Sequence, residues 1–407
     1  MRHIKTTKQA LRTFISLLRK SLVRVIRHNE KTTTTASLED LLSQQYGIDS
    51  QKTPKNGLTV AIIIRDGLTH PKSSSFIRLI SPLTDDRVKE QISIKIYPEN
   101  TTNISKMIDV CIIQRTAYDD EATASTLLNN LKKHDIKLVV DSDDAFNSID
   151  ASHPEFKLQK ERVAALNKIV KSAEEVWLST SVLAKSYTKQ ARKIVVMPNT
   201  LDKRLWQHPA SISFYRPKKK SLQLIYMGTA THDADFEMIL PALDQVASKH
   251  PDSFELTVIG VSKELPERRW IKRVRQPQFG AIYPNFVHWF KQQGPFDIGL
   301  SPLVDSKFNR GKSDIKCLDY LAAGILPVVS DVKPYSSTNL DKYIVRVKNT
   351  ATAWENQLSE YIEDSESFRD TKKLIVDAAQ DYIWSKRSSE KTGKKMILLL
   401  QELSKKK

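Results

Sequence analysis

The 407-residue chain repeats one local pattern, in which a short apolar run rich in β-branched residues is followed by a stretch of helical character. The run from Leu58 to Ile64, LTVAIII, is the clearest example. A nearly continuous apolar run of this length is typical of a strand buried on both faces of a parallel sheet. Strands that alternate with helices indicate an α/β fold. We expect further strands at 107–113, 136–140, 175–178, 193–196, 222–227, 256–259, 297–300, 326–330 and 343–347.

These strands fall into two series, and 407 residues exceed the length at which a single core usually stops growing. The sequence therefore predicts two Rossmann-like lobes in tandem, with their parallel sheets facing each other across a cleft. We expect a first lobe over residues 58–200 and a second over 201–350. Helices over 351–407 would follow and pack back toward the first lobe.

The first 57 residues differ in character from the rest. Residues 1–31 hold nine Lys or Arg against Glu30 alone, a net charge of +8. Apolar residues recur there at helical spacing, which predicts a basic amphipathic helix, followed by a polar tether up to residue 57. Such a helix could lie on an anionic membrane surface through residues 1–28, dock on the protein's own body, or act as an organelle transit peptide. The apolar stripe consists of Leu11, Phe14, Ile15, Leu18, Leu22, Val25 and Ile26.

The formal charge of +17 implies an anionic partner, such as nucleic acid, a phospholipid surface or a phosphorylated substrate. No zinc-finger spacing or RNP-like aromatic pattern supports nucleic acid. No run approaches the roughly 18 apolar residues of a membrane span, and no signal-peptide pattern is present. Cys111 and Cys317 stand singly in apolar surroundings. We therefore expect a cytoplasmic protein, which could associate with the inner face of a membrane through its N-terminal helix.

The positions of the glycines restrict the kind of nucleotide site. None occurs between Gly67 and Gly228, so the first lobe cannot hold a G-x-G-x-x-G fingerprint or a P-loop. The segment from Leu224 to Phe236 has the pattern of a strand, a tight turn at Gly228 and a helix. Free backbone N–H groups and the positive helix end could seat a diphosphate there. The donor-side candidates at this turn are Gly228, Thr229, His232 and Asp233, with Thr231 or Asp233 as the helix cap.

Residues 296–330 form the strongest block, with the pattern of a strand, a basic loop, a helix and another strand. Lys312, Lys316 and Asp319 are spaced at i, i+4 and i+7, which would place them on one helix face. Two ammonium groups could neutralise a diphosphate, and the carboxylate could accept hydroxyls of a ribose. The alternative is a surface ladder of Lys and Asp, which contributes little.

This block, with Tyr283 to Val287 and Trp289, resembles the donor lobe of group-1 glycosyltransferases, the GT4-like set with the GT-B fold. The variant KSDIK, three residues before Asp319, is similar to bacterial enzymes of surface-polysaccharide assembly, lipopolysaccharide included. In the first lobe, 109–115 and 138–144 resemble strand ends of that variant, and 198–202 resembles the segment that opens the second lobe. The resemblance covers about residues 58–345.

The resemblance implies transfer of a hexosyl or deoxyhexosyl group from a nucleoside-diphosphate sugar to a glycan or lipid-linked acceptor, with retention and without a cofactor or metal. Two positions depart from the family pattern. Of two glutamates separated by seven residues, the second is matched by Asp319, but the first falls on Gly311. An inactive scaffold paralogue is therefore an alternative. The family's Arg and Lys after the first donor strand are replaced by Thr229, Thr231 and His232, which shifts phosphate binding to Lys312 and backbone amides.

A departing nucleoside diphosphate develops negative charge, which preorganised cations stabilise. Lys312, Asp143 and Asp144 are the catalytic candidates, and Arg310, Ser313, Lys316 and Asp319 complete the donor side. Acceptor-side candidates follow the first-lobe strands: Arg65, Asp66, His70, Arg78 and Arg115.

A second interpretation takes Asp141 and Asp143 as the DxD motif of a one-domain GT-A transferase, where two carboxylates hold Mn²⁺ or Mg²⁺ against the diphosphate. A nucleic-acid-binding protein is the alternative from another class, motivated by the charge of +17.

Overall fold

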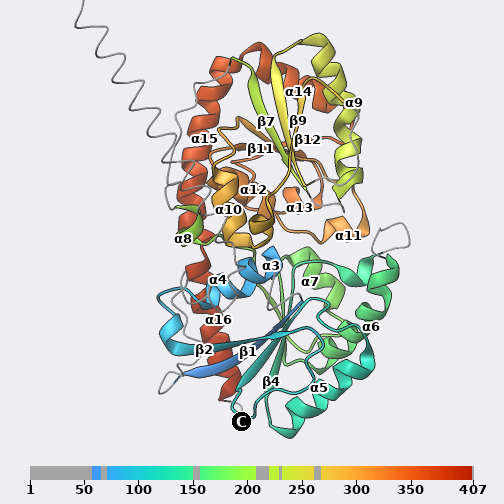
Figure 1. Cartoon of the computed structure of the whole chain (residues 1–407), viewed down its shortest axis with the longest axis vertical. Coiled ribbons are helices and arrows are strands. Elements are labelled where there is room, and N and C mark those ends of the chain that lie inside the picture. The colour runs from blue at the N-terminus through green and yellow to red at the C-terminus, as the bar shows by residue number, and fades with distance from the viewer. Residues whose placement is uncertain are drawn as a thin grey trace, which may run out of the picture.

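The computed structural model describes residues 57–65, 71–149, 156–207, 220–228, 232–260 and 267–405. They form two α/β lobes stacked along the long axis of the molecule (Figure 1). The amphipathic helix and tether predicted for residues 1–57 lie outside the described part except for Gly57, and so do Asp66, His70, Thr229 and Thr231.

The first lobe is built on a six-stranded sheet in the order β2-β1-β3-β4-β5-β6, with every pairing parallel. Its strands are β1 (Leu58–Ile64), β2 (Ile92–Pro98), β3 (Val110–Gln114), β4 (Lys137–Ser142), β5 (Glu175–Leu178) and β6 (Ile194–Val196). Its helical elements are α3 (Ser73–Ser75), η1 (Phe76–Ile80), α4 (Ser81–Leu83), η2 (Lys89–Gln91), α5 (Glu121–Lys133), η3 (Phe146–Ser148), α6 (Phe156–Ser172) and α7 (Ser181–Tyr187).

The second lobe repeats this architecture, with the parallel order β12-β11-β10-β7-β8-β9. Its strands are β7 (Leu222–Met227), β8 (Phe254–Ile259), β9 (Ile271–Val274), β10 (Ile298–Ser301), β11 (Leu326–Ser330) and β12 (Val345–Val347). The helical elements from the linker onward are α8 (Lys203–Trp206), α9 (Asp233–Lys249), η5 (Gln278–Ala281), α10 (Tyr283–Lys291), α11 (Lys307–Arg310), α12 (Ile315–Ala322), α13 (Lys333–Ser336) and α14 (Ala351–Glu363).

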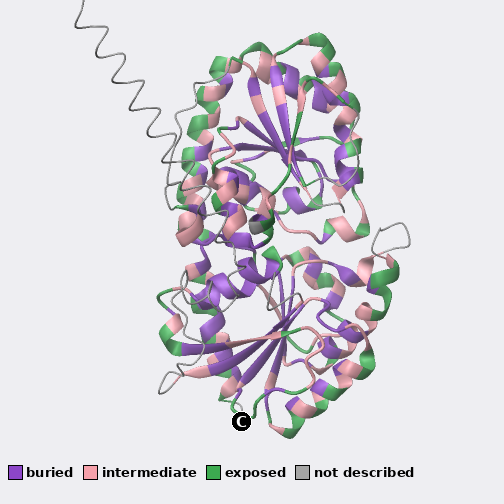
Figure 2. Ribbon diagram, viewed as in Figure 1, coloured by how far each residue is buried: buried purple, intermediate pink, exposed green. Residues whose placement is uncertain are grey.

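The strands carry the core of both lobes, as the buried colouring of the sheets in Figure 2 shows. Residues Val60 to Ile64 are fully buried, because helices cover both faces of the sheet. The predicted α/β class with two lobes, each built on a parallel sheet, is confirmed.

Two strands were not predicted, and both lie at a sheet edge. β2 alternates apolar and polar residues, and its far end is half-buried. β9 has only two apolar residues, with exposed Lys272 and Arg273 between them. A strand with one open edge needs no continuous apolar run, so the pattern used to find the buried strands does not detect it.

The C-terminal helices join the two lobes. Helix α15 (Ser365–Lys386) contacts α12 and β11 of the second lobe, and the chain then crosses to α16 (Ser389–Ser404), which packs on α4, β1 and β3 of the first. Gly393 allows the close approach, because a Cβ there would lie 2.1 Å from the carbonyl oxygen of Pro82. No helix in the described ranges is long and apolar enough to cross a membrane.

Two chain segments cross between the lobes side by side, 197–202 and 387–389. The N–H of Leu201 donates to the carbonyl of Arg387 at 2.9 Å, and the N–H of Ser389 donates to the carbonyl of Leu201 at 2.9 Å. The guanidinium of Arg387 donates twice to Asp314 of the second lobe, at 2.6 and 2.9 Å. The lobes are thus connected by two hydrogen-bonded chain segments rather than by a single linker.

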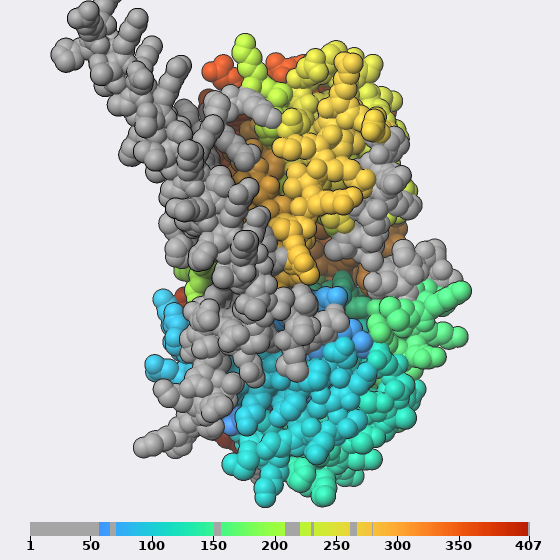
Figure 3. Space-filling view, viewed as in Figure 1, coloured from blue at the N-terminus to red at the C-terminus, as the bar shows by residue number. Residues whose placement is uncertain are grey.

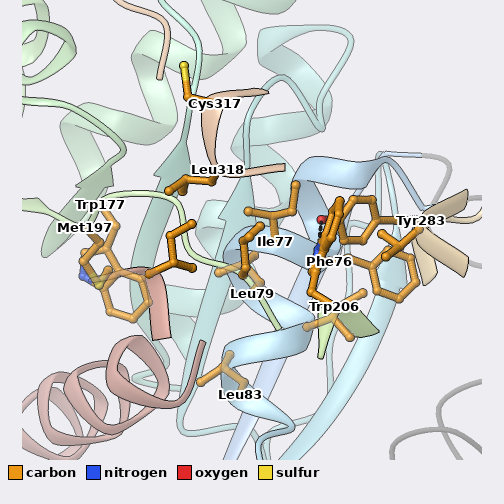
Figure 4. Packing of buried hydrophobic residues seen from close by; sticks show 14 of the residues in the cluster. Phe76, Ile77, Leu79, Leu83, Trp177, Met197, Trp206, Tyr283, Cys317 and Leu318 are labelled. Atoms are coloured by element: carbon orange, nitrogen blue, oxygen red, sulfur yellow. Dashed lines mark hydrogen bonds between the residues drawn. The ribbon is translucent and has the colours of Figure 1, made fainter. Parts of the chain in front are cut away.

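An apolar cluster continues from one lobe into the other. Figure 4 shows first-lobe residues Phe76 and Ile77 beside Trp206 of the linker and Tyr283 of the second lobe. The indole N–H of Trp206 donates to the hydroxyl of Tyr283 at 3.2 Å, and the rings of Phe76 and Tyr283 lie 6.2 Å apart. Figure 3 shows the same junction from outside, where the gold segment of the second lobe reaches the blue segment of the first.

Candidate functional site

The carboxyl ends of both sheets point toward the lobe junction. The hydroxyl of Thr180, which follows β5, donates to the carbonyl of Gly311, which follows β10, at 3.2 Å. In open α/β sheets, ligands bind at the carboxyl ends where the strand order reverses. That point lies between β1 and β3 in the first sheet and between β7 and β10 in the second. The topology therefore indicates a ligand site at the segments that follow these four strands.

Asp235 connects the segments that follow β7 and β10, at the point where the strand order of the second sheet reverses. One of its oxygens accepts a hydrogen bond from the backbone N–H of Val304, beyond β10, at 2.7 Å. The other lies 2.6 Å from Nδ1 of His232, beyond β7. Beside them the carbonyl of Gly228 approaches Gly260, where a Cβ would lie only 2.1 Å from that oxygen. Gly260 has φ +80°, so both its space and its backbone conformation require glycine.

His232 is held in its neutral form. Burial lowers its pKa to about 3, and the charges of Lys316 and Lys312 act in the same direction. Because the carboxylate of Asp235 can only accept, Nδ1 carries the proton and donates to it. The lone pair on Nε2 then faces Nζ of Lys312 at 3.5 Å. Asp235 was not a predicted site residue, and nothing in its sequence spacing distinguishes it from an ordinary residue of a helix first turn.

Lys312 and Lys316 lie together at this point. Nζ of Lys312 stands 5.2 Å from the ring centre of Phe308, and Nζ of Lys316 stands 5.6 Å from that of Tyr226. Burial lowers the pKa of Lys316 to about 8, with a further contribution from Lys312. Within the described ranges neither ammonium has a carboxylate at ion-pair distance. Two neighbouring cations, neither of them in an ion pair with a described carboxylate, favour the binding of an anion.

The helix that carries Lys316 is shorter than predicted. It begins at Ile315, so Lys312 lies in the turn before the helix and not on its face. The two ammonium groups nevertheless lie near each other, since the charge of Lys312 lowers the pKa of Lys316. The predicted pair is brought together by the turn and not by the i, i+4 spacing.

Asp319 lies on α12, one turn after Lys316. Its Oδ1 atom is buried and makes no hydrogen bond within the described part of the chain. Burial raises the pKa of this carboxyl well above its usual range, against the effect of Lys316. A protonated carboxyl can donate as well as accept a hydrogen bond, which suits it to a ligand hydroxyl.

The first turn of α9 differs from the predicted diphosphate seat. It carries Asp233 and Asp235, and no side chain caps it. Two carboxylates already compensate the positive helix end, so the attraction for an anion comes from the two lysines instead.

Two other donor-side candidates, Arg310 and Ser313, have partners of their own. Arg310 is exposed and makes two hydrogen bonds to Asp305, at 2.7 and 2.9 Å. The hydroxyl of Ser313 accepts from the amide of Asn199 at 2.8 Å, which joins it to the inter-lobe segment. These contacts give Arg310 a surface ion pair and Ser313 a place in the lobe junction.

Gly311 lies in direct contact with the first lobe. A Cβ at this position would lie 3.0 Å from Cβ of Ala145 and 3.6 Å from Leu183. A side chain as long as glutamate would not fit without movement of the lobes. The position where the family pattern places a sugar-reading carboxylate is therefore occupied here by the contact between the lobes.

The acceptor-side candidate Arg115 and the catalytic candidates Asp143 and Asp144 gather at the junction. Nε of Arg115 lies 3.3 Å from Oδ1 of Asp143, and its NH2 group donates to Asp144. The guanidinium lies 4.9 Å from the ring centre of Phe146. Burial raises the pKa of Asp143, with Arg115 opposing the effect. Arg115 has φ +54°, a conformation that costs energy for a non-glycine residue and that is often found at functional sites.

Arg78 occupies a different place from the one expected. It is 3% exposed, and three of its hydrogen bonds reach Asp141 at 2.7 to 3.0 Å. The same guanidinium donates to the carbonyl of Met197 and to Asn199, both at 2.8 Å. Arg78 thus has no surface for an acceptor, and it holds the inter-lobe segment against the first sheet.

The same contacts argue against the DxD interpretation. Both oxygens of Asp141 are taken by Arg78 and by the amide of Gln114 at 3.0 Å. Among the described residues, no group of three or more His, Cys, Asp or Glu is placed to hold a metal ion. The two-lobed fold also differs from the one-domain fold that this interpretation required.

Arg65, the remaining acceptor-side candidate, follows β1. It donates to the carbonyl of Thr116 at 2.7 and 2.9 Å and pairs with Asp119 at 2.9 Å. Arg162 reaches the same carboxylate at 2.8 Å. This arrangement fixes the loop after β3 and leaves the guanidinium of Arg65 partly exposed.

No protein-family model matches the sequence, and no curated protein sequence matches it. Solved structures do match. A glycosyltransferase from Rickettsia africae superposes with a TM-score of 0.58 at 14% identity, covering 86% of this chain and 99% of that one. HepE from Anabaena, in complex with UDP and glucose, gives 0.58 at 9% identity over 85% and 100%. OtsA gives 0.52 at 10% identity over 84% and 99%. Although the identities are low, the superpositions show that this chain shares the fold of these proteins, as the GT-B arrangement predicted from the sequence requires.

Proposed function

We propose that the chain is a glycosyltransferase that moves a sugar from a nucleoside-diphosphate sugar to a glycan or lipid-linked acceptor. The observation that carries the proposal is the pair Lys312 and Lys316, two neighbouring cations at the reversal point of the second sheet, with no carboxylate at ion-pair distance among the described residues. The fold supports it, since HepE shares this fold and binds UDP and UDP-glucose in its structures.

In the proposed reaction the bond between the sugar and the diphosphate breaks, and negative charge develops on the departing diphosphate. Lys312 and Lys316 stabilise that charge, because they are fixed before the reaction begins. The buried carboxyl of Asp319 binds ribose hydroxyls. Asp143, Asp144 and Arg115 face the junction from the first lobe and bind the acceptor. No metal is required, since the two ammonium groups supply the positive charge.

The finer assignment concerns stereochemistry and setting. We propose retention of the anomeric configuration, a hexosyl or deoxyhexosyl donor, and a role in the assembly of cell-surface polysaccharide such as lipopolysaccharide. We place the protein in the cytoplasm, in contact with the inner face of the membrane through residues 1–28. Product analysis by NMR would give the anomeric outcome. Activity in excess EDTA would support a reaction without a metal ion, and loss of activity there would contradict it.

The decisive experiment is a thermal-shift screen with UDP, GDP and dTDP. A ligand that binds only the folded state at 100 times its dissociation constant adds about 2.7 kcal/mol of stability. We expect at least one nucleotide to stabilise the wild type and to lose most of that effect in Lys312→Ala. Lys307→Ala is the matched control, since Lys307 is an exposed lysine five positions earlier. If no nucleotide stabilises the wild type, or if both variants lose the effect equally, the donor-site assignment fails.

A further inference from the structure

A second concentration of positive charge lies away from the lysine pair, on the last strand of the second sheet. Strand β9 pairs with β8 alone within the described part of the chain. The segment 267–276 around it exposes one acidic residue, Glu267. It exposes four cations, which we call the basic strip: Arg269, Lys272, Arg273 and Arg275.

Most of this charge is not compensated by neighbouring carboxylates. Arg268 is the exception, because its guanidinium makes two hydrogen bonds to Asp244, at 2.6 and 2.8 Å. Arg269, Lys272 and Arg275 have no carboxylate at ion-pair distance among the residues described. One cation is enough to discourage another strand from pairing with an edge, so four exceed that need.

The basic strip leads toward the lobe junction. β9 runs parallel to β8, so its carboxyl end lies at the same edge of the sheet as the lysine pair. At about 3.3 Å per residue, the strand from Ile271 to Val274 spans roughly 10 Å. The chain continues through η5 into α10, where Tyr283 meets Phe76 of the first lobe. Figure 3 shows this gold segment on the face toward the viewer, above its contact with the first lobe.

The apolar residues within the strip are turned inward. Trp270, Ile271 and Val274 are half-buried and pack against the core clusters of the lobe. The strip therefore offers no exposed apolar side chain to insert into a bilayer, and its four exposed cations follow one another within seven residues of the chain. Exposed cations without exposed apolar neighbours suit a soluble polyanion better than a bilayer, whose binding also draws on buried apolar area.

We propose that the basic strip binds an anionic chain, with carboxylate or phosphate groups along it, and guides it to the lobe junction. The proposal rests on the proposed function and assigns the acceptor to a chemical class: a polyanionic glycan or glycan–lipid chain. The strip holds the part of that chain behind the end that receives the sugar.

The test compares two full-length triple variants that each lose three positive charges. Arg269→Gln/Lys272→Gln/Arg275→Gln, the strip variant, removes three of the four cations of the strip. Lys132→Gln/Lys133→Gln/Lys160→Gln removes three exposed lysines of α5 and α6 on the first lobe. The basic N-terminal residues remain in both, so their contribution to binding cancels. The probes are a fluorescent oligogalacturonate, its neutral methyl ester, and a short polyphosphate, each titrated at low ionic strength.

We expect the strip variant to bind at least one anionic probe roughly tenfold more weakly than the wild type, or more, and the lysine control to bind within about twofold. The stronger of the two anionic probes identifies carboxylate or phosphate as the preferred group. Equal losses in both variants, or binding of the neutral ester as tight as that of the acid, would overturn the proposal. So would a strip variant that keeps its affinity but self-associates on gel filtration, because the cations would then serve only to keep the edge unpaired.

Two further measurements separate this proposal from others. The first is binding to anionic phosphatidylglycerol vesicles. If the strip variant loses its affinity for these vesicles but keeps its affinity for both soluble polyanions, the strip belongs to a membrane contact and the proposal is overturned. Nucleotide stabilisation should be unchanged in the strip variant. If nucleotides fail to stabilise even the wild type while the strip still binds polyanions selectively, the proposed function fails and the strip remains a polyanion site.

Discussion

Arg78 and Arg310 allow a direct test of how burial changes the contribution of an ion pair to stability. Both bind an aspartate through two guanidinium nitrogens, at 2.7 to 3.0 Å for Arg78 and 2.7 to 2.9 Å for Arg310. The side chains of Arg78 and Asp141 are 2% and 0% exposed, whereas those of Arg310 and Asp305 are 54% and 46% exposed. The geometry is thus similar and the environment opposite.

We expect Arg78→Met to lower the free energy of unfolding by about 3 to 5 kcal/mol, because it leaves the carboxylate of Asp141 buried without its cation. The loss also leaves the carbonyl of Met197 and the amide of Asn199 without a donor, which weakens the inter-lobe segment. Arg310→Met removes a solvent-screened pair and should cost about 0.2 to 1 kcal/mol.

Urea unfolding followed by circular dichroism measures both changes. In the background Asp141→Asn, the Arg78→Met substitution should cost clearly less than in the wild type, because no buried charge is then left behind. Equal losses for Arg78→Met and Arg310→Met would refute the argument from burial. A full loss on the Asp141→Asn background would show that the stabilisation does not come from this ion pair.

Three further predictions concern the junction of the lobes. Lys316, with its pKa near 8, should lose its charge as the pH rises from 7 to 9. Nucleotide affinity measured by calorimetry should therefore fall over that range in the wild type, and it should fall much less in Lys316→Arg. His232 stays neutral down to about pH 3 in the folded state, whereas in the unfolded chain it takes up a proton near pH 6.5. The contribution of His232 to the free energy of unfolding is therefore present above pH 6.5 and is lost as the pH falls toward 3. Unfolding curves of His232→Gln should lack this pH-dependent loss of stability. Gly311→Ala should cost about 1 to 3 kcal/mol, because its Cβ would lie 3.0 Å from that of Ala145, and Ala145→Gly should restore the thermal midpoint; no change in either variant would contradict the contact.

Much of the fold was readable from the sequence because buried parallel strands need continuous apolar runs. The run from Leu58 to Ile64 coincides with β1, and the runs at 175–178, 222–227 and 326–330 coincide with β5, β7 and β11. The edge strands β2 and β9 escaped, since one open edge permits polar and charged residues. Local composition thus identified all the central strands and the edge strands β6 and β12, and it missed the two edge strands that carry more polar or charged residues.

The candidate site was only partly determined by local sequence. Lys312, Lys316 and Asp319 could be chosen from their spacing, but the helix begins only at Ile315. The preceding residue, Asp314, is bound by Arg387, which lies 73 residues further along the chain. That contact is invisible to any local pattern, and the lysine pair forms through the turn that results.

The tertiary structure alone decided which polar residues face the junction and which hold the lobes together. Arg78 and Asp141 lie 63 residues apart, and Arg78 and Asn199 lie 121 apart, so no spacing relates them. In sequence, Arg78 and Arg115 are equivalent cations near strand ends; in the structure one is buried in the connection and the other faces the junction. Periodicity reports how deeply a residue is buried, whereas its partners depend on strand order and on the crossing of the chain between lobes, which long-range packing determines.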